Sequence, residues 1–397
     1  MKEIIALSVA FGLLISCSSQ EKKFSVQEIE SPANQSAGEP YLFTDPSGNV
    51  FLSWIEDQDS LSFLKLSQWQ NEKWSEPVTI TSGNNWFVNW ADYPLAVSDG
   101  NGNFMAHILD RSGEGTFAYD VKIVSSTDGV TWGTPRVLHD DGKQAEHGFV
   151  SLVPFGVNVF VSWLDGRNTV SDNPEEHSDH GHHGEMSVRA ALVDYNGEKI
   201  GEWELDKRVC DCCQTTAAIT DNGPVVIYRD RSDEEVRDMS IVRFVNGAWT
   251  TPKPIYSDNW EINGCPVNGP RSEAIGNTLA IAWFTMANEK PRVNVIFSED
   301  GGETFGKPMQ VNDSTSGGRV DLVLLDEQSA LVSWMEGPAI KVARVFSNGK
   351  KESTTTVSKS SESRSSGFPQ LTKSGNTVMM AWTDDKNKVI KTAVIGL

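Results

Sequence analysis

The sequence has 397 residues, of which 54 are acidic and 34 basic, so its formal net charge is -20 at pH 7. Such an acidic chain excludes nucleic acids and anionic membrane surfaces as partners, because both require clustered Lys and Arg side chains. Helical periodicity is almost absent, while short strands with alternating apolar residues recur along the chain, and this pattern predicts an all-β protein.

The first 23 residues predict an export signal and a tether. Lys2 precedes a run of apolar residues that is too short to span a membrane. The run ends in Leu14-Ile15-Ser16-Cys17, which resembles the lipobox of bacterial lipoproteins. This resemblance implies a signal peptide at 1–16 and lipidation of Cys17. Residues 17–23 would form a tether, and 24–397 an exported body, periplasmic or on the cell surface, that meets the membrane only through its lipid.

A repeated strand dominates the rest of the chain. Its seven copies end near a Trp or a similar residue, and they lie at 51–57, 104–110, 159–165, 225–230, 279–284, 330–336 and 378–384. Each copy follows another apolar run across a turn, and most precede a third strand. Several repeats also carry a fourth element, and four strands per repeat predict the blades of a β-propeller. The last repeat has only three strands, so we expect the strand at 24–29 to supply its fourth and close a seven-bladed ring.

Two turns carry a sharper signature. The first, at 126–132, reads STDGVTW, and the second, at 298–305, reads SEDGGETF. Both resemble the Asp-box, a hairpin turn of the sialidase-like (BNR-repeat) propeller superfamily, and the resemblance covers nearly the whole chain after the tether. It implies a propeller, with six blades as in sialidases as the alternative to seven, and structural roles for Asp128 and Asp300.

The unusual residues fall in loops that a propeller brings to one face. The loop entering the innermost strand of a blade and the loop between its second and third strands lie at the same end of that blade. Three cysteines and several Arg and Asp residues occupy such loops between Cys210 and Asp238, and a long insertion occupies 168–186. Because binding residues usually sit on loops presented by a rigid scaffold, we expect a functional site around the axis on this face.

One hypothesis for this site is glycan binding or glycoside hydrolysis. The segments CDCCQTTAAIT, YRDRSDEEVRD and GCPVNGPR resemble those of bacterial exported proteins named exo-α-sialidase from their fold. The resemblance implies catalytic acids, here Asp92, Asp165 and Asp230. Groups that would hold a glycan or small-molecule ligand are Arg167, Arg229, Arg231, Arg237, Asn268, Arg271, Arg319 and Asp321. The chain departs from sialidases because it lacks an Arg-Ile-Pro motif near the first blade and a Tyr in the expected late blade.

A second hypothesis is a metal site. Cys210, Cys212 and Cys213 lie close in sequence, with Cys265 one blade later and His147 one blade earlier. Thiolate and imidazole ligands together suit Cu(I) or Zn, so copper or zinc is the cofactor that this hypothesis implies. The insertion adds His177, His180, His182 and His183. An even number of cysteines in an exported body also permits disulfides, for example from Cys212 or Cys213 to Cys265, and the sequence leaves both readings open.

A third hypothesis is a recognition or assembly module without chemistry. Charged residues would then pair with one another across the mouth, and Trp86, Phe87 and Trp90 would be candidates for contact with a sugar or a protein, or for core packing under the rim. The ligand-binding hypotheses predict instead that Asp165→Ala or Arg231→Ala abolishes ligand binding and leaves thermal stability nearly unchanged.

Overall fold

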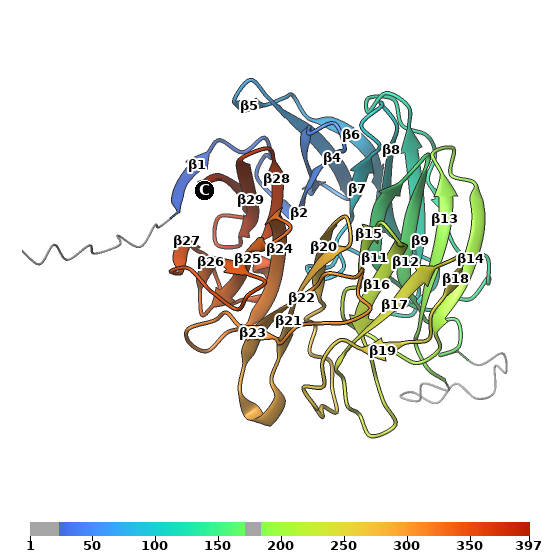
Figure 1. The fold of residues 1–397 in the computed structure, drawn as a ribbon. Coiled ribbons are helices and arrows are strands. Elements are labelled where there is room, and N and C mark those ends of the chain that lie inside the picture. The colour runs from blue at the N-terminus through green and yellow to red at the C-terminus, as the bar shows by residue number, and fades with distance from the viewer. Residues whose placement is uncertain (1–23, 171–183) are drawn as a thin grey trace, which may run out of the picture.

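The computed structural model describes residues 24–170 and 184–397, and Figure 1 shows them as seven antiparallel sheets arranged around a centre. The seven-bladed propeller is confirmed, and the six-bladed alternative is wrong. Segments 1–23 and 171–183, which hold Cys17 and the four histidines of the insertion, lie outside the described residues. Among the residues that are described, no helix is long and apolar enough to cross a membrane.

Each blade is a meander whose first strand faces the axis. The first strands of neighbouring blades contact one another in a continuous ring. The first three blades contain β2 (Ala37–Thr44), β3 (Val50–Gln58), β4 (Leu61–Gln70), β5 (Lys73–Trp74) and β6 (Val78–Gly83); β7 (Ala96–Ser98), β8 (Phe104–Arg111), β9 (Tyr119–Ser126) and β10 (Arg136–Val137); and β11 (His147–Phe155), β12 (Asn158–Asp165), β13 (Ser187–Asp194) and β14 (Lys199–Asp206).

The last four blades repeat this order. They contain β15 (Thr216–Thr220), β16 (Gly223–Arg229), β17 (Met239–Val245), β18 (Ala248–Trp249) and β19 (Lys253–Pro254); β20 (Arg271–Ile275), β21 (Thr278–Thr285), β22 (Arg292–Ser298) and β23 (Met309–Gln310); β24 (Gly318–Asp326), β25 (Ser329–Glu336), β26 (Ala339–Phe346) and β27 (Thr355–Lys359); and β28 (Gln370–Ser374), β29 (Thr377–Asp384) and β30 (Val389–Gly396).

The N-terminal strand β1 (Ser25–Ile29) completes the last blade. It pairs antiparallel with β30, from Ser25 opposite Gly396 to Ile29 opposite Thr392. An ion pair between Glu28 and Lys391 adds to this pairing. The two ends of the described chain therefore share one sheet and close the ring.

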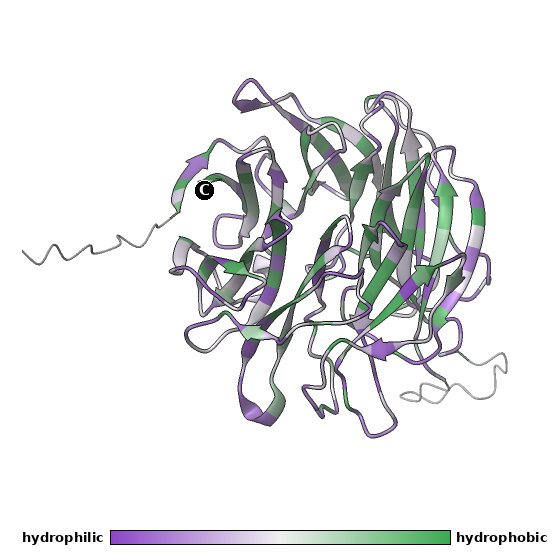
Figure 2. Cartoon of the chain, viewed as in Figure 1, coloured by the Kyte–Doolittle hydropathy of each residue, from purple (hydrophilic) through white to green (hydrophobic). Residues whose placement is uncertain are grey.

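The core explains the Trp that marks the repeat. Trp54, Trp163, Trp283 and Trp334 are at most 1% exposed, each on the second strand of its blade. Three of their indole N–H groups donate to an acid two residues later, namely Trp54 to Glu56 at 3.4 Å, Trp163 to Asp165 at 2.8 Å and Trp334 to Glu336 at 2.9 Å. Figure 2 shows hydrophobic residues concentrated on the strands and hydrophilic residues on the loops. The repeated acid thus lets a large indole be buried with its N–H satisfied.

Side chains tie each first strand to the next blade. A first strand is the edge of its sheet, so its outward N–H groups need other acceptors. In four successive blades a side chain of one first strand accepts an N–H of the next. The acceptor and donor pairs are Ser151 and Ala217, Thr216 and Ser272, Glu273 and Leu324, and Asp321 and Leu371. The axis is therefore lined by polar side chains that already accept hydrogen bonds from the neighbouring blade.

The turn around Asp300 lies at the end of blade five opposite to the entry loops. Asp300 accepts hydrogen bonds from the Ser298 hydroxyl at 2.7 Å and from the Thr304 N–H at 2.8 Å. Slight burial opposes a low pKa, but the hydrogen bonds from Thr304 lower the pKa of Asp300 to about 2. The side chain therefore accepts these bonds as a carboxylate at neutral pH.

Asp300→Ala should lower the free energy of unfolding by about 1–2 kcal/mol, because the turn loses its acceptor. It should leave metal content and ligand affinity unchanged. Urea unfolding measures the first effect, with the exposed neighbour Glu299→Ala as the matched control. Altered ligand affinity in Asp300→Ala would contradict the assignment of this turn to the face away from the site.

Candidate functional site

The strand register places the entry loops and the second-to-third loops on one face. His147 at the start of β11 lies opposite Asp165 at the end of β12. At the other end of a blade, Phe104 at the start of β8 lies opposite Ser126, where the turn containing Asp128 begins. These loops therefore share one face of the propeller, the entry face, and the turns such as that of Asp128 lie on the opposite face.

Four cysteines meet on the entry face. Cys210, Cys212 and Cys213 lie in the loop between β14 and β15, and their sulfur atoms all lie within 4.8 Å of one another. The Sγ of Cys210 is 3.9 Å from that of Cys212 and 3.7 Å from that of Cys213. Cys265, from the connection between blades four and five, lies within hydrogen-bonding reach of Cys212. These four residues form the thiol cluster, and all four are free cysteines, so no disulfide joins them.

Two arginines lie beside the buried thiol of Cys210. Arg237 Nη1 donates to the Sγ of Cys210 at 3.3 Å, and the same guanidinium pairs with Glu235 at 2.7 Å. Hydrogen bonds from Cys212 and Cys213, with the nearby positive charges of Arg229 and Arg237, hold the pKa of Cys210 well below its ordinary value. These contacts favour the thiolate form of Cys210 over the thiol.

The pKa values of the other three cysteines are also shifted, two upward and one downward. Burial raises the pKa of Cys213 to about 12. The hydrogen bonds that Cys212 gives to its neighbours raise its pKa, and the bond from Cys212 lowers the pKa of Cys265. Within the cluster the pKa values of Cys210 and Cys265 are therefore lowered, while those of Cys212 and Cys213 are raised.

A cavity of about 270 Å³ lies beside the thiol cluster. Its lining includes Phe117, Glu146, Met186, Asp211 and Arg231. Arg231 pairs with Glu235 at 2.7 Å and lies 3.4 Å from Asp211. Burial, opposed by a hydrogen bond from Tyr119, raises the pKa of Glu146 to about 8. The cavity therefore offers one cation and one carboxyl that keeps its proton at neutral pH.

A Tyr, a Glu and an Asp meet beneath this cavity. The Tyr119 hydroxyl lies 2.9 Å from Glu146 and 3.3 Å from Asp92. Asp92 also accepts the Phe149 N–H at 2.7 Å, and burial raises its pKa to about 7. Tyr119 is fully buried under the stacked ring of Phe87, and burial raises its pKa well above 10. Neither Asp92 nor Tyr119 is therefore presented to a ligand.

The structure places His147 in a different group from the cysteines. His147 Nε2 lies 3.1 Å from Asp141 and 3.8 Å from Asp165, while its Nδ1 lies 3.2 Å from the carbonyl oxygens of Tyr119 and Ala145. Both ring nitrogens thus face oxygen acceptors. The expectation that His147 joins the thiol cluster has no support among the described contacts.

Asp165 and Arg167 form a buried tie. Asp165 is fully buried and accepts two hydrogen bonds from Arg167, both at 2.7 Å. These bonds and the charge of nearby His147 lower the pKa of Asp165 despite its burial. In contrast to the sequence-based prediction, we expect Asp165→Ala to lower stability, because it would remove the nearest partner of a largely buried guanidinium and leave only the longer pairs of Arg167 with Asp141 and Glu202.

Most other predicted ligand residues also have internal partners. Arg229 is buried and donates to the carbonyl oxygens of Arg237, Asn268 and Phe284. Asp230 accepts the Ser240 hydroxyl at 3.0 Å, and burial raises its pKa. The Arg319 guanidinium lies over the Trp90 ring, which stacks on Phe368, and donates to the Ser366 hydroxyl. The backbone N–H of Arg319 donates to the Asn268 side chain. Trp90 and Phe87 are partly buried and pack on Phe368 and Tyr119, respectively.

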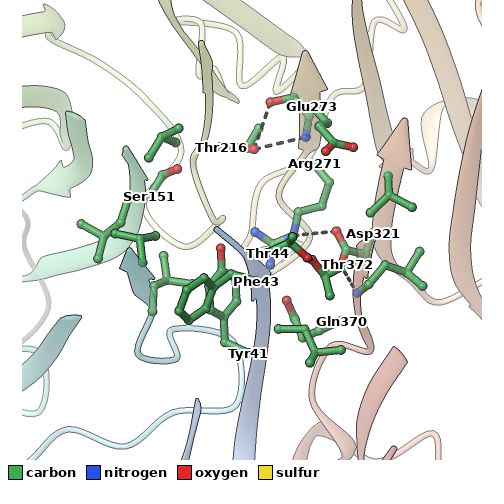
Figure 3. Close-up of a pocket in the computed structure, with 18 of the residues that line it drawn as sticks. Tyr41, Phe43, Thr44, Ser151, Thr216, Arg271, Glu273, Asp321, Gln370 and Thr372 are labelled. Atoms are coloured by element: carbon green, nitrogen blue, oxygen red, sulfur yellow. Dashed lines mark hydrogen bonds and ion pairs between the residues drawn. The ribbon is translucent and has the colours of Figure 1, made fainter. Parts of the chain in front are cut away.

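The central channel holds the remaining predicted residues. Its cavity of about 420 Å³ is lined by Arg271, Asp321 and residues of the surrounding first strands (Figure 3). Gln214, next to Cys213 in sequence, donates to the Ala91 carbonyl at 2.5 Å and accepts the Gly269 N–H at 2.9 Å. This bridge links loops from opposite sides of the ring and covers the channel at the entry face.

Comparison with known proteins gives the fold alone. No protein-family model matches the chain, and no curated protein does. A protein of unknown function from Dyadobacter fermentans is 11% identical over 94% of this chain and 99% of its own, with a TM-score of 0.51. The polysaccharide lyase Uly1 is 10% identical over 93% and 91%, with a TM-score of 0.52. The NanB sialidase of Streptococcus pneumoniae is 12% identical over 93% and 70%, with a TM-score of 0.45.

These neighbours share an architecture. Of the two with TM-scores above 0.5, one is a polysaccharide lyase and the other has no known function. A shared propeller does not transfer chemistry at such low identity, so function must be argued from the residues of the site.

Sequence reasoning missed four residues that matter here. Glu235 and Asp211 fix the arginines beside the cysteines, Glu146 lines the adjacent cavity, and Gln214 covers the channel. Glu235 and Asp211 lie within the unusual stretch that ends at Asp238, and Glu146 precedes His147, so their positions in entry-face loops were available. Glu235 pairs within its own loop, but the partners of Asp211, Glu146 and Gln214 come from other parts of the chain and could not be read from the sequence.

Proposed function

We propose that this propeller is an exported metal-binding protein whose centre is the thiol cluster. The carrying observation is the spacing of the sulfur atoms, 3.7 Å between Cys210 and Cys213 and 3.9 Å between Cys210 and Cys212. Four sulfur ligands held tetrahedrally at about 2.3 Å from one ion lie about 3.8 Å apart. The spacing of Cys210, Cys212 and Cys213 therefore fits three ligands of a soft ion, Zn(II) or Cu(I), and Cys265, beside Cys212, would be the fourth.

The surroundings of the cluster support this proposal. A metal ligand must be a thiolate, and Arg237 with Arg229 stabilises negative charge at Cys210. Hydrogen bonds from outer residues to ligand atoms orient the ligands and adjust the properties of the ion, and Arg237 provides such a bond to sulfur. Glu235 holds Arg237 in place through a second ion pair.

Glycan hydrolysis is the weaker candidate on the residues present. A sialidase-type reaction needs an accessible Tyr nucleophile, and Tyr119 is fully buried with a pKa above its ordinary value. The candidate acids Asp92 and Asp165 are buried in structural hydrogen bonds. The specific observation in favour of a glycan is the 270 Å³ cavity, where Glu146 retains a proton that it could donate.

We further propose that the protein is a lipoprotein held in the periplasm or at the cell surface by Cys17. The motif ending at Cys17 carries this part of the proposal. Cys17→Ala should release the protein from membranes, and fractionation with a lipid-labelling assay tests it. Membrane retention and labelling in the variant would contradict lipidation at this residue.

Metal content and free thiols, measured on protein purified without chelator, test the metal centre. We expect one equivalent of zinc or copper, which is lost in both Cys210→Ser and Cys265→Ser. Ser257→Ala, an exposed residue in the same connection as Cys265, should retain the metal.

Two results would contradict the metal centre. Four reactive thiols that take up neither added Zn(II) nor Cu(I) would leave the cysteines without a metal role. An absence of both metal and free thiols would mean that disulfides brace the entry face.

A further inference from the structure

The described chain begins at the face opposite the thiol cluster. In blade seven Thr377, beside the turn between β28 and β29, pairs with Gly396, and Gly396 pairs in turn with Ser25. That turn joins a first strand to a second strand, so it lies at the end of the blade opposite to the entry loops. Phe24 packs on the apolar core of the last two blades. The polypeptide therefore meets the propeller at blade seven, on the face away from the entry loops (Figure 1).

The thiol cluster also lies on the far side of the ring from blade seven. Contacts between first strands run around the ring from β2 to β28 and back to β2. Three of the cysteines lie in the loop between β14 and β15, which joins blade three to blade four. In a ring of seven blades, this junction is the point farthest from blade seven. The cluster is therefore remote from Ser25 in two directions, along the axis and across the ring.

A lipid on Cys17 is too close to blade seven to reach the cluster. The chain from Cys17 to Phe24 spans at most about 25 Å, even when it is fully extended. The eight-residue strand β29, which runs from one face to the other, is about 24 Å long. A fully extended tether would therefore end at the rim of the entry face on blade seven, with the thiol cluster still across the ring. The opposite face can approach a membrane without any such extension.

The accessible part of the thiol cluster faces solvent on the entry face. Cys265 is exposed and Cys212 is partly buried, whereas Cys210 and Cys213 are each 1% exposed. A ligand from another molecule can therefore replace Cys265 first, while the buried cysteines retain the ion. Arg237, which donates to the Sγ of Cys210, holds the buried part of the cluster in place during such an exchange.

We propose that the lipid anchor turns the opposite face toward the membrane, so that the thiol cluster exchanges its ion with a soluble carrier and not with a membrane-embedded transporter. This inference rests on the lipidation of Cys17 and the metal centre proposed above. The carrier presents thiolate ligands of its own, because soft ligands are needed to compete with cysteines for Zn(II) or Cu(I). Since the cluster lies across the ring, it stays accessible even when the body tilts on blade seven.

Energy transfer to a membrane dye tests the orientation. Lipidated protein on phosphatidylcholine vesicles carries one fluorophore, attached through an azide-bearing amino acid at one of two exposed positions. Asn376 lies on the turn between β28 and β29, and Glu234 lies in the loop that holds Arg237. Transfer to a headgroup-labelled lipid should be at least about twofold stronger from position 376, because the two faces lie about one strand length apart.

Two controls make the orientation test specific. Lys386, exposed at the entry-face end of blade seven, should give transfer between that of the other two positions. Cys17→Ala should give no transfer from any position, so a failure of lipidation is recognised separately, by a wild-type protein that behaves in the same way. Equal transfer from positions 376 and 234 in lipidated protein, or stronger transfer from 234, would overturn the orientation.

Loading with Zn(II) from a dextran-linked dithiol tests the soluble partner, because this probe stays in solution. Vesicle-bound wild-type protein and unbound Cys17→Ala should take up the ion at rates within about twofold of each other, since an accessible site keeps its encounter rate. Uptake about tenfold or more slower on vesicles would show that the membrane blocks the cluster and would overturn the proposal. Failure of both proteins to load would contradict the metal centre itself, and energy transfer would still decide the orientation.

Discussion

Replacing Asp165 with alanine should lower the free energy of unfolding by about 3–5 kcal/mol, the loss expected when one partner of a buried ion pair is removed. The Asp165 carboxylate is fully buried and accepts hydrogen bonds from Trp163 at 2.8 Å and from Arg167 at 2.7 Å. Alanine would leave the indole N–H of Trp163 without its acceptor and would leave the Arg167 guanidinium only its longer pairs with Asp141 and Glu202, both at 3.3 Å. The effect is one of stability, because no ligand can reach this carboxylate.

Urea unfolding of two further variants makes this test specific. Asp165→Asn keeps an acceptor for Trp163 and loses the charge, so its loss of stability should be smaller. Asp233→Ala removes an exposed partner of Arg208 and should change stability by less than about 1 kcal/mol. A loss of less than about 1 kcal/mol in the free energy of unfolding of Asp165→Ala would show that the Asp165–Arg167 pair contributes little to stability. Asp165 would then again be a candidate for ligand binding.

The protein should be more stable at pH 5 than at pH 8. Burial raises the pKa of Glu39, Asp92 and Glu273 to about 7 and that of Asp321 to about 6. Because these values exceed those of the unfolded chain, folding favours the protonated groups. Their contribution is therefore complete below about pH 4 and is lost as the pH rises through 6 to 7. For Glu273 alone the loss by pH 8 is on the order of 3 kcal/mol.

Melting temperatures measured between pH 5 and pH 8 check this slope. Glu273→Gln cannot ionise and can still accept the Leu324 N–H, so its melting temperature should fall less over the same range. The exposed Glu299→Gln should follow the wild-type slope. A melting temperature that rises toward pH 8 would mean that these carboxyl groups are ionised at little cost in the folded ring.

Much of the fold could be predicted because its signals are local. Each signal is read from a few neighbouring residues. These signals are the Trp or similar residue of each repeat, the turn sequences around Asp128 and Asp300, and the incomplete seventh repeat. Alternating apolar residues fix which face of a strand is buried, and turns fix where strands end. Seven repeats of one pattern therefore specify seven blades.

The roles of the charged residues could not be predicted because their partners come from distant parts of the chain. Arg229 is buried because Asn268 and Phe284, from the next blade, supply carbonyl oxygens. Arg271 has no such acceptor among the described residues, although both residues look alike in the sequence.

The pairing of β1 with β30 sets an order of events during biogenesis. Ser25 and Gly396 lie near opposite ends of the sequence, yet they are neighbours in one sheet. The first strand to be synthesised must therefore wait unpaired until the last strand has followed it. Closure depends on the longest-range contact in the chain, which makes it intrinsically slow. Loss of β30 alone would expose two sheet edges, on β1 and β29, and would make an otherwise complete propeller prone to aggregation.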